Sequence, residues 1–297
     1  MNRFFSILFL LCLLLSLTAC GGKPQDADPP GGAPAQDTAA PPEAPPADTD
    51  NPEEPVLTED EARRAAFAEI LRTAHDRQLL PDGTVLDGNS IESIEGNLFA
   101  LHDVDGDGAE ELILLWQNAA MAGQTEIVYG YDEAAGEVRE ELREFPGVIF
   151  YSNGAAEAPW SHNQGWAGEF WPYTLHRYAL ESGVYENMGS VDAWDYSLIS
   201  NGFPHDVDAD GDGMLYTLLT DNWNFTYHQG SAGSGEYWYY EEPPVDGAEY
   251  LAWRDGIVGD AEALELSFVS LTAENIAQTL DVPYEALITT LLPNAAG

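Results

Sequence analysis

Carboxylates alternate with other residues in a short acidic stretch of this 297-residue chain. Counting from Asp103, acids stand at positions 1, 3, 5 and 9, and Gly108 at position 6 permits a sharp turn. Calcium takes about six to eight oxygen ligands at about 2.4 Å, and this spacing wraps alternate side chains around one ion. Carboxylates held on alternate positions would repel one another strongly without a cation. The sequence therefore predicts a calcium site here, with the main-chain carbonyl of Ala109 as its ligand at position 7.

This loop resembles the FG-GAP-type calcium loops of β-propeller repeats more closely than it resembles an EF-hand. An EF-hand has a glutamate at position 12, where this chain has Leu114, and it continues into a helix instead of an apolar strand. In FG-GAP-type loops an acid at position 9 closes the ring. The resemblance covers one loop, so it implies a metal site and not a whole propeller. The ligands that it implies are Asp103, Asp105, Asp107 and Glu111.

A second acidic stretch, at 205–214, repeats this pattern in either of two registers. Counting from Asp208 it repeats Asp-x-Asp-Gly-Asp-Gly, and counting from Asp206 it repeats His-Asp-Val-Asp. Position 9 is then Tyr216 or Met214, and neither is a carboxylate. We expect a second calcium here, bound more weakly than in the first stretch, and a remote acid could complete its shell. The candidate ligands are Asp206, Asp208, Asp210 and Asp212.

An aromatic segment at 160–173 lies between the two acidic stretches, and polar side chains separate its rings. Such rings can stack on sugars or grip a peptide. The candidate contacts are Trp160, His162, Trp166 and Trp171. The interpretation that we favour is a loop pinned to the core by its rings. No catalytic residue is nominated, because Ser161 and His162 are adjacent in sequence and the partners of a triad are normally brought together by the fold.

The charge balance excludes several classes of partner. Lys and Arg number 10 against 52 Asp and Glu, which gives a net charge of −42. Nucleic acid and anionic lipid headgroups both attract clustered cations, so we expect no nucleic acid and no electrostatic adhesion to lipid. Cations, by contrast, should be drawn to this protein. The only cysteines are Cys12 and Cys20, so the chain beyond residue 20 has no disulfide or thiol chemistry.

The N-terminal residues 1–19 are typical of a signal peptide. Arg3 precedes an apolar run at 4–17, which is too short to cross a bilayer as a helix. Leu17-Thr18-Ala19-Cys20 then resembles the lipobox of bacterial lipoproteins, whose cysteine is acylated and becomes the new N-terminus. The resemblance implies lipidation at Cys20. It also implies a location on the extracytoplasmic face of the cell membrane.

Two regions of different composition follow the signal. Residues 20–55 are rich in Pro, Ala and acids and contain no aromatic residue and no Ile, Leu, Met or Val. They cannot bury enough apolar surface to fold, so we expect a disordered tether after the lipidated cysteine. Residues 56–297 are long enough for a globular domain and hold both acidic loops.

Hydrophobic periodicity predicts an α+β fold for that domain. Thr58 and Glu61 fit a capping box at the start of a helix. The strands are predicted at 98–101, 112–116, 126–131, 138–145, 148–151, 173–180, 184–191 and 215–220, and the later helices at 248–253, 273–280 and 284–292. The short connections favour a mostly antiparallel β meander, with the N-terminal helix and the C-terminal helices packed on it.

The mature chain as a whole resembles uncharacterised lipid-anchored lipoproteins of Gram-positive anaerobes, on the strength of a helix, the Asp-x-Asp-Gly-Asp-Gly loop and the Ser-His-Asn-Gln-Gly segment. The resemblance implies class and location but no activity. We expect a calcium-binding module for a carbohydrate or protein ligand. The alternative is a calcium-dependent hydrolase of cell-wall or dietary polysaccharide, which would need a pair of carboxyl groups in a cleft near the aromatic segment. A solute-binding lipoprotein would need two βαβ lobes, and the meander pattern speaks against it.

Overall fold

The computed structural model describes residues 57–86, 94–163, 165–200, 202–219 and 242–283. The predicted signal peptide, Cys20, the tether and the helix predicted at 284–292 lie outside these residues. Within them the chain forms three α-helices and two antiparallel sheets of five strands each, so the α+β expectation is confirmed. No helix among the described residues is long and apolar enough to cross a membrane.

The first sheet is a meander with one strand added from the C-terminal region. Its order is β10-β1-β2-β3-β4, and all neighbours are antiparallel. The strands are β1 (Leu98–His102), β2 (Glu111–Trp116), β3 (Thr125–Asp132), β4 (Glu137–Glu144) and β10 (Val269–Ser270). β1 and β2 form a hairpin that places the first acidic loop at its tip.

The second sheet is also a meander, in the order β5-β6-β7-β8-β9, and its neighbours are antiparallel too. The second acidic loop leads directly into its last strand. The strands are β5 (Ile149–Phe150), β6 (Ala155–Pro159), β7 (Tyr173–Ala179), β8 (Val184–Asp195) and β9 (Met214–Leu219). Short connections explain the meander of the first sheet, because a parallel crossover needs about a dozen residues or more.

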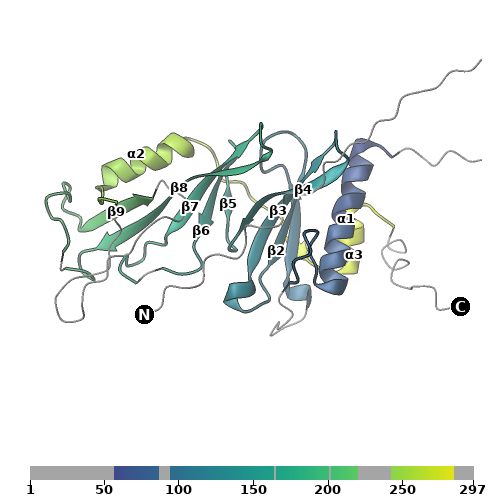
Figure 1. Cartoon of the computed structure of the whole chain (residues 1–297), viewed down its shortest axis with the longest axis horizontal. Helices are drawn as coiled ribbons and strands as arrows, with labels where there is room; N and C mark the ends of the chain where they lie inside the picture. The colour runs from purple at the N-terminus through teal and green to yellow at the C-terminus, as the bar shows by residue number, and fades with distance from the viewer. Residues whose placement is uncertain (1–56, 87–93, 164, 201, 220–241, 284–297) are drawn as a thin grey trace, which may run out of the picture. The chain divides into compact units, whose positions relative to one another are not determined.

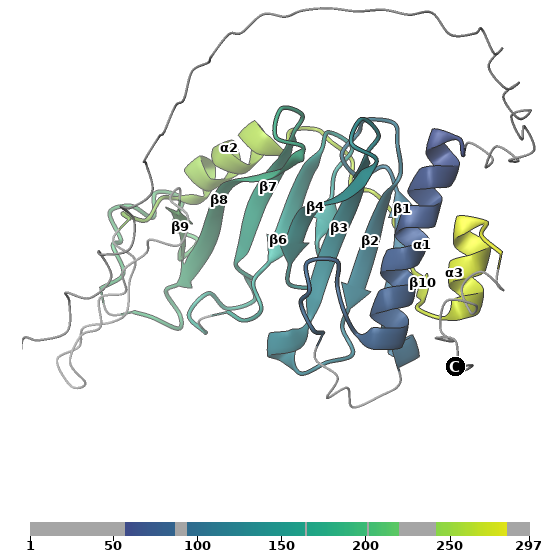
Figure 2. The same ribbon diagram turned by 45° about the vertical axis from the view of Figure 1, so that its right-hand side comes forward.

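Two helices cover one face of the first sheet. α1 (Glu59–Arg77) begins with the predicted capping box, in which Thr58 and Glu61 exchange hydrogen bonds. α3 (Ala273–Leu280) has Thr272 as its N-cap, and the hydroxyl of Thr272 accepts a hydrogen bond from the main-chain N–H of Asn275. Both helices contribute to one core with β1, β2 and β3, and Figures 1 and 2 show α1 and α3 side by side. Leu112, Leu114 and Trp116 of β2 are buried in this core.

A second core joins the two sheets. The first sheet contributes Ile113, Val128 and Leu142 to this core, and the second sheet contributes Phe150 and Tyr185. Because β2 has helices on one side and the second sheet on the other, all six of its residues are buried. Its unbroken apolar run is therefore explained by burial on both faces.

The remaining helix, α2 (Gly247–Ile257), packs on the second sheet in a third core with β7 and β8. Arg254 of α2 donates a hydrogen bond to Glu157 of β6 and another to the hydroxyl of Tyr151. Figure 1 shows α2 beside β7, β8 and β9. The helix therefore lies over the strand that follows the second acidic loop.

Candidate metal centres

The first acidic loop, residues 103–111 (loop 1), is folded by its own carboxylates. Asp103 accepts hydrogen bonds from the main-chain N–H groups of Gly106 and Gly108, at 2.8 and 3.1 Å. Asp105 accepts one from Asp107, and Asp107 accepts one from Ala109. Both glycines have positive φ, which residues with a side chain adopt at a cost. The alternating acids and the two glycines thus shape the loop together.

Glu111 closes loop 1 from the buried side. Its exposed fraction is 3%, and Oε2 accepts a hydrogen bond of 2.9 Å from the main-chain N–H of Val104. Single carboxylate oxygens of Asp103, Asp105 and Glu111 all lie within 4.8 Å of one another, so this group could hold a metal ion. Burial raises the pKa of Glu111 to about 9, and repulsion by Asp105 adds to the shift. A cation among these groups would favour their ionised forms.

Glu141 is a further buried acid beside loop 1, and no pattern in the sequence indicates its position there. In the pairing of β3 with β4, Val128 lies opposite Leu142 and Tyr129 opposite Glu140. Glu141 is therefore the extra residue of a β-bulge, a feature that redirects side chains. Burial raises its pKa to about 8, with repulsion by Asp105 next, and the guanidinium of Arg139 opposes the shift. Glu141 thus places a further buried carboxyl group on the inner side of loop 1.

Loop 1 belongs to the first sheet but is held against the second. The hydroxyl of Tyr185, on β8, donates a hydrogen bond of 2.8 Å to the carbonyl of Val104. A Cβ placed on Gly154 would lie 2.9 Å from the carbonyl oxygen of Asp105, so only glycine fits this approach. The group formed by Asp103, Asp105 and Glu111 (the loop 1 site) therefore lies where the two sheets meet.

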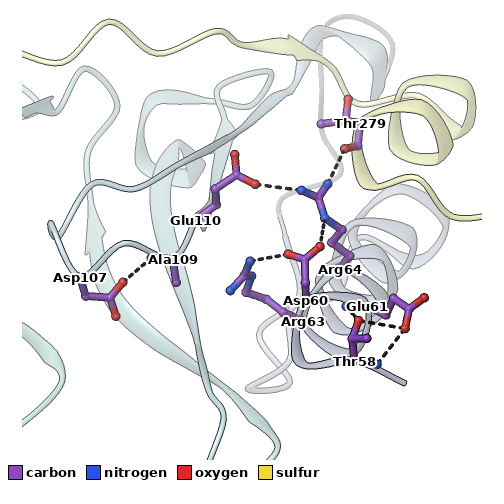
Figure 3. A network of polar contacts seen from close by, with 9 residues as sticks. All are labelled: Thr58, Asp60, Glu61, Arg63, Arg64, Asp107, Ala109, Glu110 and Thr279. Carbon is purple, nitrogen blue, oxygen red and sulfur yellow. Dashed lines mark hydrogen bonds and ion pairs between the residues drawn. The ribbon is translucent and has the colours of Figure 1, made fainter. Parts of the chain in front are cut away.

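The neighbouring acid Glu110 faces the helices instead. Its carboxylate pairs with Arg64 of α1 at 3.2 Å, and Arg64 also donates to the carbonyl of Thr279 on α3. Figure 3 shows Glu110 directed at Arg64, with the Asp107–Ala109 bond in the same loop. Glu110 lies just before β2 and Glu111 is the first residue of that strand, and the two carboxylates meet different partners. Glu110 ties loop 1 to α1 and α3, and Glu111 points into the loop 1 site.

The second loop, residues 208–214 (loop 2), has the same internal hydrogen bonds. Asp208 accepts from the N–H groups of Gly211 and Gly213, Asp210 accepts from Asp212, and Asp212 accepts from Met214. Gly211 and Gly213 have positive φ, like the two glycines of loop 1. The geometry therefore follows the register that counts from Asp208.

A remote residue completes the acidic group of loop 2. One carboxylate oxygen each of Asp208, Asp210 and Asp246 lie within 4.8 Å of one another, so this second group (the loop 2 site) could also hold a metal ion. Asp246 stands immediately before α2, and 7% of it is exposed. Its Oδ2 accepts a hydrogen bond of 3.1 Å from the main-chain N–H of Ala209.

The remaining predicted ligands lie beside these groups and not in them. Asp107 and Asp212 accept hydrogen bonds from their own loops and are exposed, and neither belongs to a three-acid group. Asp206 is exposed and precedes the folded loop. Asp246 was not foreseen, because it lies 36 positions after Asp210 and no local pattern links the two. An Asp before a helix indicates only a cap.

The aromatic segment at 160–173 is held by hydrogen bonds of its indoles. Trp160 donates to Thr174, Trp166 to Asp192, and Trp171 to the carbonyl of Trp160. His162 is exposed and contacts the hydroxyl of Ser161 at 3.0 Å. Trp171 keeps 46% of its surface exposed. These bonds agree with the interpretation that the rings pin this loop to the protein.

No family model, curated protein or solved structure matches this chain. The loop 1 site and the loop 2 site therefore carry the functional interpretation. Both present carboxylate oxygens alone, and neither includes a histidine. Such all-oxygen groups suit hard cations such as calcium and magnesium better than zinc or copper.

Proposed function

We propose that this protein is a lipid-anchored, extracytoplasmic calcium-binding protein. The ion at the loop 1 site stabilises the junction of the two sheets, and the assembled domain acts as a binding or interaction module. The observation that carries the proposal is the buried Glu111, which faces Asp103 and Asp105 at that junction.

Calcium suits this group better than magnesium. The loop 1 site presents carboxylate oxygens from three residues, and calcium accepts many arrangements of oxygen ligands because its coordination is flexible. Magnesium requires near-ideal octahedral geometry and retains several waters. An extracytoplasmic location also fits, since calcium sites of extracellular modules work at millimolar concentrations of the ion.

The anchor is proposed from the sequence alone. Leu17-Thr18-Ala19-Cys20 supplies a site for acylation, and the tether at 20–55 would hold the domain away from the bilayer. Two or more acyl chains give stable membrane attachment, whereas one gives only marginal attachment. Among the described residues, the indoles of Trp160, Trp166 and Trp171 bind groups of the protein itself, and no contact there favours the hydrolase alternative.

A thermal melt of the full chain in EDTA, calcium or magnesium tests the proposal. With calcium at ten times its dissociation constant, each occupied site stabilises the fold by about 1.4 kcal/mol. For a domain of this size the melting temperature then rises by about 3–6 °C per site. We expect calcium to restore the loss caused by EDTA and magnesium to restore little of it. Equal melting temperatures in all three conditions would show that both loops are acidic turns that bind no calcium.

A further inference from the structure

We propose that loop 2 forms a second calcium site that Asp246 closes, and that the ion fastens the first turn of α2 to this loop. The inference rests on the proposed calcium binding and extends it from a local loop to a long-range link. Asp246 and Asp208 come from separate segments of the chain, so an ion between them would tie those segments together.

The carboxylate of Asp246 has one oxygen that nothing in the described protein satisfies. Asp246 is 7% exposed, and its Oδ1 is buried with no hydrogen-bond partner among the described residues. A buried, unpartnered carboxylate oxygen is costly, and such atoms nearly always have a partner. The same carboxylate lies with those of Asp208 and Asp210 within 4.8 Å. A cation at this point would satisfy all three.

Asp246 occupies the place in loop 2 that Glu111 occupies in loop 1. Glu111 accepts a hydrogen bond from the N–H of Val104, the second residue of its loop. Asp246 accepts one from Ala209, the second residue of the other loop. The four hydrogen bonds inside each loop also match, position by position. The ring that lacked an acid at position 9, where Tyr216 stands, is therefore completed by a residue beyond β9.

Asp246 does not serve α2 as an ordinary cap. It has the extended backbone of an N-cap residue, but its side chain accepts no hydrogen bond from the first turn of the helix. The positive end of the helix would by itself draw a carboxylate toward the helix amides. The carboxylate is turned toward loop 2 instead, which is the direction that a shared cation requires.

The link would control how firmly α2 sits on the second sheet. Val245 exchanges two main-chain hydrogen bonds with Tyr216 of β9, which fixes the chain just before Asp246. The ring of Tyr250, in the first turns of α2, stacks on that of Tyr216 with centroids 4.2 Å apart. The hydroxyl of Tyr250 contacts that of Tyr173 on β7 at 2.9 Å. An ion at Asp246 would thus hold this aromatic stack in place.

Hydrogen exchange of the α2 amides at 251–257 in the full chain tests the inference. If calcium is present at ten times its dissociation constant, openings that release the ion become about elevenfold rarer. We expect wild-type protein to show this gain in protection when EDTA is replaced by calcium. Asp246→Asn and Asp208→Asn should lose the gain, whereas the matched control Asp206→Asn should keep it. Asp246→Asn retains an oxygen for the N–H of Ala209, and circular dichroism verifies its fold.

Glu111→Gln separates this inference from the proposed function, because it disables only the loop 1 site. In that variant calcium should still protect α2. If calcium protects the β1–β2 hairpin of the wild type but leaves α2 unchanged, the link through Asp246 is wrong and the loop 1 site stands. Equal protection of α2 in Asp246→Asn and the wild type would also overturn the link. If calcium protects neither region, the proposed function fails as well.

Discussion

The buried carboxylates of this protein differ in the groups that surround them. Glu126 of β3 is 3% exposed, and its Oε2 accepts hydrogen bonds from the main-chain N–H groups of Gly147 and Val148. That acid has protein partners and braces the connection between β4 and β5. Glu111 and Asp246 each accept one main-chain hydrogen bond and also face two other acids. Burial therefore marks candidate ligands only when like charges surround the acid.

Glu126 predicts a measurable pH dependence of stability. Burial raises its pKa above 4.5, the value of an ordinary glutamate, although the two N–H groups oppose the shift. The folded state therefore holds the proton to higher pH than the unfolded state does. The contribution of Glu126 to the free energy of unfolding is therefore fully present below about pH 4.5. It is lost as pH rises through the pKa that Glu126 has in the folded state.

We expect Glu126→Gln to remove the loss of stability with rising pH, because the amide oxygen still accepts both hydrogen bonds without carrying charge. Glu126→Ala leaves two buried donors unpaired and should cost about 1–3 kcal/mol. Urea unfolding between pH 4 and 8 measures the free energy of unfolding for each variant. A Gln variant as unstable as the Ala variant at pH 7 would show that the charge itself is required.

The candidate ligands of loop 1 could be predicted because they are local. The acids at Asp103, Asp105 and Glu111 stand close in sequence, and their spacing alone suggests a ring. Asp246 and Glu141 could not be predicted in the same way. The first depends on how α2 docks beside loop 2, and the second depends on a β-bulge. Both result from tertiary packing, which leaves no periodic signal in the sequence.

At the scale of elements, strong periodicity was a good guide and weak periodicity was not. The helix at 273–280 has the predicted bounds, and the strand predicted at 184–191 extends to Asp195. β6 was missed because its Ala-rich sequence has low β propensity. β10 was missed because a strand of two residues shows no alternation. Its place at the edge of the first sheet follows from pairing with β1.

The contact between loop 1 and the second sheet depends on Gly154. This residue has φ of +74°, and its missing Cβ leaves room for the carbonyl of Asp105. Gly154→Ala should destabilise the fold by about 1–3 kcal/mol through backbone strain, with a further loss from the clash. Gly83→Ala is the matched control, since Gly83 has φ of +84° and no atom within 4 Å of the added carbon.

Chemical denaturation and calcium titration of both variants separate the two effects. We expect Gly154→Ala to lose more stability than Gly83→Ala and to bind calcium more weakly. Equal losses, with calcium affinity unchanged in both, would show that the junction tolerates a wider spacing between loop 1 and the second sheet.

In the molecule as a whole the two sheets share a core, the first sheet is covered by α1 and α3, and the second is covered by α2. Each sheet contributes a loop of the same internal geometry, and each loop is completed by a buried acid. An ion at loop 1 would stabilise the junction of the sheets, and an ion at loop 2 would stabilise the attachment of α2. Calcium would thus act on the tertiary structure and not only on two surface turns.

The proposed anchor makes a prediction about the intact chain in a bacterium. Cys20→Ala removes the thiol that would be acylated, so we expect no incorporation of labelled fatty acid and an unprocessed or shed protein. Labelling followed by fractionation of membranes measures both. If the variant still partitions fully with membranes, the lipobox interpretation is wrong.

Calorimetric titration of the full chain with calcium measures binding of the ion at the loop 1 site. Glu111→Gln removes the charge of the buried acid, whereas Glu110→Gln makes the same change at the neighbouring acid that pairs with Arg64. We predict that the wild type and Glu110→Gln bind calcium alike, and that Glu111→Gln weakens one binding event by about tenfold or more. Equal binding by Glu111→Gln and Glu110→Gln, or no binding by the wild type at millimolar calcium, would contradict the account.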